Sequence, residues 1–158
     1  MCSRRFWSAS RAPLAVKGDV KAGPPLVHAF DLAQAGEGTL TITKVEAGCG
    51  CLRQSLGAAV LRPGERTRLT LEVNTLTQPD GPNRWQAVVS YMVEAPGVPA
   101  RVGELALHIT ATLSRDVVVS PPQVAISTGS AASQTLVVTD KRAKPLTVLK
   151  AASSSPHL

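Results

Sequence analysis

Apolar and polar residues alternate along three stretches of the chain, at residues 66–74, 84–94 and 104–113. Because successive side chains of a β-strand point to opposite faces, this period of two predicts strands that each bury one face. Apolar residues spaced three and four apart over the length of a helix are missing, so we expect almost no helix. The three strands are predicted to form a rigid antiparallel core through Leu69, Leu71, Val73, Trp85, Ala87, Val89, Tyr91, Val93, Leu105, Leu107, Ile109, Ala111 and Leu113.

Shorter apolar segments precede these stretches, and turn-forming residues separate them. Gly36-Glu37-Gly38 predicts a hairpin between two of the segments. Pro63-Gly64 predicts a tight turn just before residue 66. Seven strands with inward-facing apolar residues on two sheets would form a sandwich core. The four additional strands are expected at residues 14–20, 26–33, 39–46 and 58–61.

Two similar stretches, 106 residues apart, indicate an internal repeat. The run LTITK at residues 40–44 matches LTVLK at residues 146–150 without a gap. A period of about a hundred residues is typical of an immunoglobulin-like sandwich rather than of a solenoid unit. The sequence therefore predicts an all-β chain: a flexible lead at residues 1–13, an immunoglobulin-like β-sandwich of about seven strands at 14–114, and an incomplete second immunoglobulin-like repeat at 115–158.

The second repeat has room for only the opening strands of a sandwich. We expect them at residues 117–119, 124–126, 134–139 and 146–150. A segment of this size is close to the limit below which a core of its own is insufficient. Unpaired strand edges recruit other strands, so a protein partner or a neighbouring domain is expected to complete the segment, for example by strand addition.

Composition and charge exclude several classes of function. The formal net charge of +6 would permit an acidic partner. The basic residues are scattered, however, and the aromatic content of 3% leaves few rings for stacking on bases, so we expect no nucleic-acid binding. No apolar run is long enough to span a bilayer, and the first residues of the given chain lack the apolar core of a secretory signal.

Catalytic motifs are missing from the sequence. We find no nucleophile elbow, no glycine-rich phosphate loop followed by Lys, and no paired His on a helix. The carboxylates are distributed like solubilising surface charge. The sequence thus predicts a protein that is not an enzyme and holds no cofactor.

Cys49-Gly50-Cys51 is the one constellation that could form a site. In an extended strand these cysteines would face the same side with Cα atoms about 6.6 Å apart, near the upper limit for a disulfide. Three interpretations are open: a structural corner with free thiols, which we favour; a soft-metal (copper or zinc) or thiol redox site; and a strained disulfide. The other ligands of a metal site are not evident, since His28 and His108 are the only imidazoles of the first domain.

The order of motifs resembles a bacterial family. It runs from Phe30 through a glycine turn to the "L-x-I" of residues 40–42, the Cys-Gly-Cys corner, and the apolar-x-Pro-Gly-Glu turn of residues 61–65. This pattern is similar to the domain-of-unknown-function family numbered 1573, over about residues 15–113. The resemblance implies an immunoglobulin-like domain of the major-sperm-protein and cilium-associated type, in exported or envelope-associated proteins with no assigned activity.

Together these features predict a non-catalytic structural or binding module within a larger bacterial envelope-associated protein. The alternative is a metal or redox role at Cys49 and Cys51.

Overall fold

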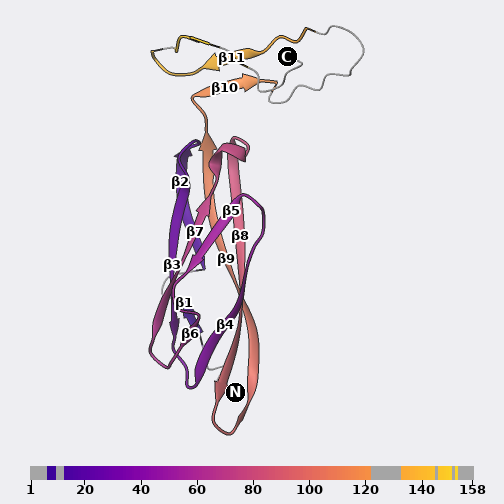
Figure 1. The fold of residues 1–158 in the computed structure, drawn as a ribbon. Helices are drawn as coiled ribbons and strands as arrows, with labels where there is room; N and C mark the ends of the chain where they lie inside the picture. Colours follow the sequence, from indigo (N-terminus) through magenta and orange to yellow (C-terminus); the bar gives the residue numbers. More distant parts are fainter. Residues whose placement is uncertain (1–6, 10–12, 122–132, 145, 151, 153–158) are drawn as a thin grey trace, which may run out of the picture. The chain divides into compact units, whose positions relative to one another are not determined.

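A computed structural model describes residues 7–9, 13–121, 133–144, 146–150 and 152 of the chain (Figure 1). The chain divides into two compact units, Met1–Ser114 and Arg115–Leu158. All regular secondary structure of the described residues is β-strand, apart from a single short 3₁₀ turn, η1 (Thr75–Thr77). This agrees with the all-β prediction. The described part of the chain holds no helix long and apolar enough to cross a membrane.

The first unit is a sandwich of two sheets. One sheet has the strand order β1-β3-β7-β5, and the other has the order β2-β9-β8-β4-β6. All neighbouring strands are antiparallel except β2 and β9, which are parallel. The strands are β1 (Trp7–Ala9), β2 (Leu14–Lys21), β3 (Leu26–Gln34), β4 (Thr39–Ala47), β5 (Leu52–Leu56), β6 (Val60–Leu61), β7 (Arg66–Val73), β8 (Gly81–Ala95) and β9 (Val98–Ser114).

The three alternating stretches form the core as predicted. They correspond to β7, β8 and β9, whose inward side chains meet between the sheets. Tyr91 and Leu105 are only partly buried, toward the far end of the β8–β9 hairpin, which reaches beyond the rest of its sheet in Figure 1. The core includes Phe30, Leu32, Leu40, Ile42, Leu61, Leu69, Leu71, Val73, Trp85, Ala87, Val89, Leu107, Ile109 and Leu113.

The predicted hairpin between β3 and β4 is wrong, because these strands lie in different sheets. β3 pairs with β7, and β4 pairs with β8. The buried amide of Gln34 holds the connection: its Nε2 donates to the Gly38 carbonyl (3.0 Å), and its Oε1 accepts from the Gly36 amide (3.4 Å). Gly38 has a positive φ, and a side chain there would collide with the Glu94 carbonyl oxygen. The glycine turn therefore carries the chain across to the other sheet.

Two strands of the first unit have no counterpart in the sequence prediction. β5 pairs with β7 but contains apolar residues only at its two ends, so it shows no alternation. β1 pairs with β3 and lies in the stretch expected to be an irregular lead.

The second unit contains a two-stranded antiparallel sheet of β10 (Val117–Ser120) and β11 (Val137–Asp140). β11 begins three residues later than predicted. The strand expected at residues 124–126 lies outside the described residues. The expected strand at residues 146–150 is wrong, because this segment has no regular secondary structure.

Candidate functional site

The Cys-Gly-Cys corner carries the chain from β4 in one sheet to β5 in the other. A disulfide joins Cys49 and Cys51, whose Cα atoms are 5.2 Å apart. The expectation of free thiols is therefore wrong for this structure. That expectation assumed an extended segment, whereas the Leu52 amide donates to the Cys49 carbonyl (3.2 Å) and bends the chain into a turn that brings the Cα atoms closer.

Backbone hydrogen bonds fix this corner to both sheets. The Gly48 amide donates to the Gln86 carbonyl of β8 (2.8 Å), and the Asn74 amide at the end of β7 donates to the Cys51 carbonyl (2.8 Å). A Cβ at Gly48 would lie 2.9 Å from the Gln86 oxygen, so this close approach requires glycine. Both cysteines are half-buried against the core. The disulfide thus sits at a rigid, partly accessible place.

The buried polar groups near this corner hold neighbouring loops. The fully buried Thr75 hydroxyl accepts from the Gly23 amide and donates to the Pro24 carbonyl, both at 2.9 Å. Trp85 Nε1 donates to Gln78 Oε1 (3.0 Å). These contacts give Thr75, Trp85 and Gln78 structural roles. They do not bring the three side chains around a common reacting centre.

The two histidines of the sandwich do not join the cysteines. His28 lies on β3, two strands from β5, and its ring meets the edge of the Phe30 ring at 4.5 Å. Burial, and then the charge of Lys17, lower the pKa of His28 against the opposing effect of Asp31. His108 lies on β9, two strands from β4.

His108 lies on the outer face of β9, is half-buried, and accepts a hydrogen bond from Arg84 Nε at its Nδ1 (3.4 Å). Burial, followed by the Arg84 charge, lowers the pKa of His108. Among the residues that the structure describes, no group of three or more His, Cys, Asp or Glu side chains could hold a metal ion.

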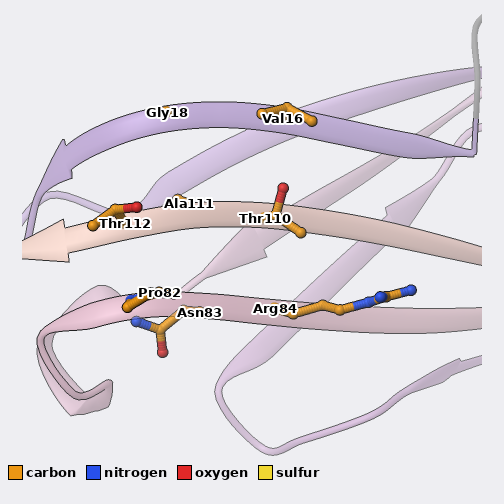
Figure 2. A pocket seen from close by; sticks show the side chains of 8 residues that line it. All are labelled: Val16, Gly18, Pro82, Asn83, Arg84, Thr110, Ala111 and Thr112. Atoms are coloured by element: carbon orange, nitrogen blue, oxygen red, sulfur yellow. The ribbon is translucent and has the colours of Figure 1, made fainter.

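A shallow hollow of about 330 Å³ lies on the outer face of β2, β9 and β8 (Figure 2). It forms where the register of β2 against β9 shifts between Val16 and Asp19, at the positive-φ residue Gly18. The periodicity of the sequence gave no indication of this hollow. It is lined by Val16, Gly18, Pro82, Asn83, Arg84, Thr110, Ala111 and Thr112.

Among the described residues, β9 has no neighbouring strand along part of one edge. β2 pairs with β9 only from His108 onward. Over residues 98–107, β9 has β8 on one side and no strand among the described residues on the other. Val102, in the middle of this segment, is 83% exposed. Alternation predicted the strand, but which of its edges stays unpaired depends on the order of strands in the sheet.

Several solved structures are similar to this chain. VesB protease from Vibrio cholerae matches with a TM-score of 0.52 at 14% identity, over 68% of this chain and 32% of that protein. The ASH / PapD-like domain 7 of human CEP192 matches with a TM-score of 0.52 at 9% identity, over 66% of this chain and 83% of that domain. WR4, a C. elegans MSP family member, matches with a TM-score of 0.47 at 11% identity, over 68% and 98%.

At these identities the likeness shows the fold alone, an immunoglobulin-like β-sandwich. The chain spans about a third of the length of VesB protease. No curated protein matches it significantly. The family model described as protein of unknown function (DUF1573) matches residues 15–95, which include most of the sandwich and the Cys-Gly-Cys corner. The chain belongs to the DUF1573 family.

Proposed function

We propose that the chain is a non-catalytic structural or binding module, and that its second unit presents strands to another polypeptide. The observation that carries this proposal is the exposure of apolar side chains in the second unit. Val137 and Val138 of β11 are 54% and 43% exposed, and Leu149, which follows β11 in the sequence, is 93% exposed. A two-stranded sheet is at best marginally stable on its own. A strand from a protein partner or from a neighbouring domain would both pair the sheet edge and cover these side chains.

A photo-crosslinking amino acid at Val138, introduced into the full chain in the source cells, tests this proposal. The matched control is the same amino acid at Val27, an exposed valine on β3 of the sandwich. We expect a crosslink to one defined polypeptide from position 138 and none from position 27. Equal crosslinking from both positions, or none from position 138, would contradict the proposal.

We further propose that the module belongs to a larger envelope-associated protein. The disulfide at Cys49 and Cys51 supports export, because disulfides persist in oxidising compartments and are rare in the cytosol. Trapping of free thiols by rapid alkylation in intact source cells checks this. We expect both cysteines to be protected from the alkylating reagent until a reductant is added. Complete alkylation without reductant would place the protein in a reducing compartment.

A thiol redox or soft-metal role at Cys49 and Cys51 is the second candidate. It is favoured by the corner, which brings both sulfurs together at a partly accessible place. In the redox version, a thiolate of a partner dithiol attacks one sulfur and the other leaves as a thiolate. The second partner thiol then resolves the mixed disulfide, so the partner is oxidised and the pair of cysteines is reduced.

In the metal version, the reduced pair supplies two thiolates, and the remaining ligands come from outside this corner. Native mass spectrometry of the reduced chain with Cu(I) or Zn²⁺ separates the two versions, with Cys51→Ser as the control. A stoichiometric adduct that Cys51→Ser abolishes supports the metal version. If no adduct forms while a dithiol protein exchanges with the disulfide, the redox version stands. If neither occurs, the corner is structural.

A further inference from the structure

We propose that the open edge of β9 at residues 98–107 is a self-association surface, which pairs antiparallel with the same edge of a second copy of this chain. This inference concerns the sandwich and is independent of the partner proposed for the second unit. Three features of the sandwich support it: the direction of the backbone groups at the edge, the row of side chains that ends there, and the net charge.

The backbone groups of every second residue point out of the sheet along this edge. The His108 amide donates to the Pro13 carbonyl (2.7 Å), so the peptide groups of His108 face the β2 side. The register of β9 against β8 is regular from Leu113 back to Arg101. Residues of the same parity face the same side of a strand, so the N–H and C=O groups of Val102, Glu104 and Ala106 point outward at the open edge.

If a two-fold axis normal to the sheet relates the two copies, the joined sheets have their outer faces on the same side. This symmetry pairs outward-pointing residues with one another, and the registers near the middle of the open edge are centred on residues 102, 103 or 104. A register centred on Glu104 would place two carboxylates opposite each other, and one centred on Gly103 would place Val102 opposite Glu104. A register centred on Val102 places the two valines together, with Arg101 opposite Gly103, and Glu104 then lies opposite the irregular part of β9, where the register against β8 shifts between Arg101 and Val98. This register has no like charges directly opposite each other.

The same register extends an existing row of side chains across the outer face. Val60 pairs with Thr41, Thr41 with Met92, and Met92 with Val102. Val60 is 54% exposed and Val102, at the end of the row, is 83% exposed. In the dimer this row would continue from Val102 of one copy to Val102 and then Met92 of the second copy. Val102, the most exposed valine of the sandwich, would thereby be covered.

The charge of the sandwich favours this contact. Residues 14–114 contain nine Lys and Arg and nine Asp and Glu, so the excess positive charge of the chain lies in the N-terminal lead and the second unit. A formally neutral surface does not repel its own copy, and net charge near zero promotes association. A second copy therefore fits this edge better than a strongly acidic or basic peptide would.

Sedimentation velocity of the full chain over a range of concentrations tests the proposal. We expect a monomer–dimer equilibrium that Val102→Lys weakens by about tenfold, because it removes the valine pair and places two ammonium groups together. Val27→Lys, on the other sheet, should leave the equilibrium unchanged. Because Val102 is highly exposed, Val102→Lys should keep the circular dichroism spectrum and the denaturant midpoint of the parent chain.

Val138→Lys separates this inference from the proposed function. If Val138→Lys abolishes association and Val102→Lys does not change it, the second unit is responsible and the β9 edge is not an interface. A chain that stays monomeric at all concentrations would also overturn the inference, whatever crosslinks form at position 138.

The register has its own test. Cys2→Ser first removes the one cysteine outside the Cys49–Cys51 disulfide. In that background, Val102→Cys should form an intermolecular disulfide on mild oxidation, whereas Ala106→Cys, which lies four residues away from the two-fold axis, should not. Equal crosslinking of both variants, or of neither, would contradict pairing centred on Val102.

Discussion

In the sandwich, Leu69, Leu71 and Val73 of β7 are fully buried, whereas Val137 and Val138 of β11 in the second unit are about half exposed. Both strands carry apolar side chains, and both pair antiparallel with their neighbours. The difference is that β7 lies between two neighbours and beneath a second sheet, while β11 has a single neighbour among the described strands. An apolar strand contributes to stability only when other chain segments remove its side chains from water.

Loop anchoring differs between the two units in the same way. Gln34 in the sandwich is completely buried and bonds two backbone groups of the connection from β3 to β4. Asp140 in the second unit accepts from the Arg142 side chain and backbone and from the Leu146 amide (2.6 Å). The Arg142 hydrogen bonds hold the pKa of Asp140 well below its usual range. One loop is held by a neutral group inside a core, and the other by an ion pair next to water.

Hydrogen exchange should give the largest contrast between the units. Amides of β7 should exchange only through global unfolding, whereas those of β11 should open locally at little cost, because few apolar contacts protect them. The expected difference in protection is several orders of magnitude, measured on the dilute monomer by mass spectrometry or NMR. Equal protection of Val137–Asp140 and Arg66–Val73 would show that the second unit is complete as it stands.

Truncation of core side chains should give the next largest effect. Leu71→Ala or Ile109→Ala should lower the free energy of unfolding by about 2–5 kcal/mol, because each leaves a cavity between the sheets. Val138→Ala should change it by less than about 0.5 kcal/mol. Urea denaturation measures all three. If Val138→Ala is as costly as Leu71→Ala, the second unit must contribute to a shared cooperative core.

Removal of the loop anchors should have a smaller effect. Gln34→Leu leaves the Gly36 amide and the Gly38 carbonyl without their partner and should cost about 1–3 kcal/mol. Asp140→Asn should leave the unfolding of the sandwich unchanged and alter only amide chemical shifts around Leu146. The control is Gln54→Leu, whose exposed Nε2 donates to the Val45 carbonyl and can be replaced by water. A Gln34→Leu effect no larger than that of Gln54→Leu would contradict the role of the buried amide.

The pH dependence of His28 should be the smallest effect. Its pKa is lower in the folded protein than its ordinary value of 6.5, so the unfolded chain takes up the proton first as the pH falls. Stability should decrease as the pH drops below about 6.5 and level off beneath the folded pKa. His28→Gln should reduce this slope, and the slope that remains should come from His108. Denaturant midpoints between pH 5 and 8 measure it. An unchanged slope would show that His28 is not the responsible group.

The pattern of apolar residues is enough to predict which strands carry the core. The alternation in β7, β8 and β9 specifies the buried face of each strand, because a shift of one residue would turn every apolar side chain to water. The Pro-Gly turn before β7 and the glycine turn after β3 also lie where the sequence placed them. The motifs between Phe30 and Glu65 were enough to indicate the family.

The pairing of the strands, in contrast, could not be read from the sequence and depends on the folded chain. A glycine turn between two apolar strands is compatible with a hairpin or with a crossing between sheets, and the buried Gln34 amide selects the crossing. The separation of Cys49 and Cys51 likewise depends on the turn closed by the Leu52 amide, which residue spacing does not reveal. Among the described strands, the edge of β9 at residues 98–107 is open because β2 joins β9 only from His108 onward. Each of these features depends on contacts between residues distant in the sequence, whereas periodicity reports only on the faces of a single strand.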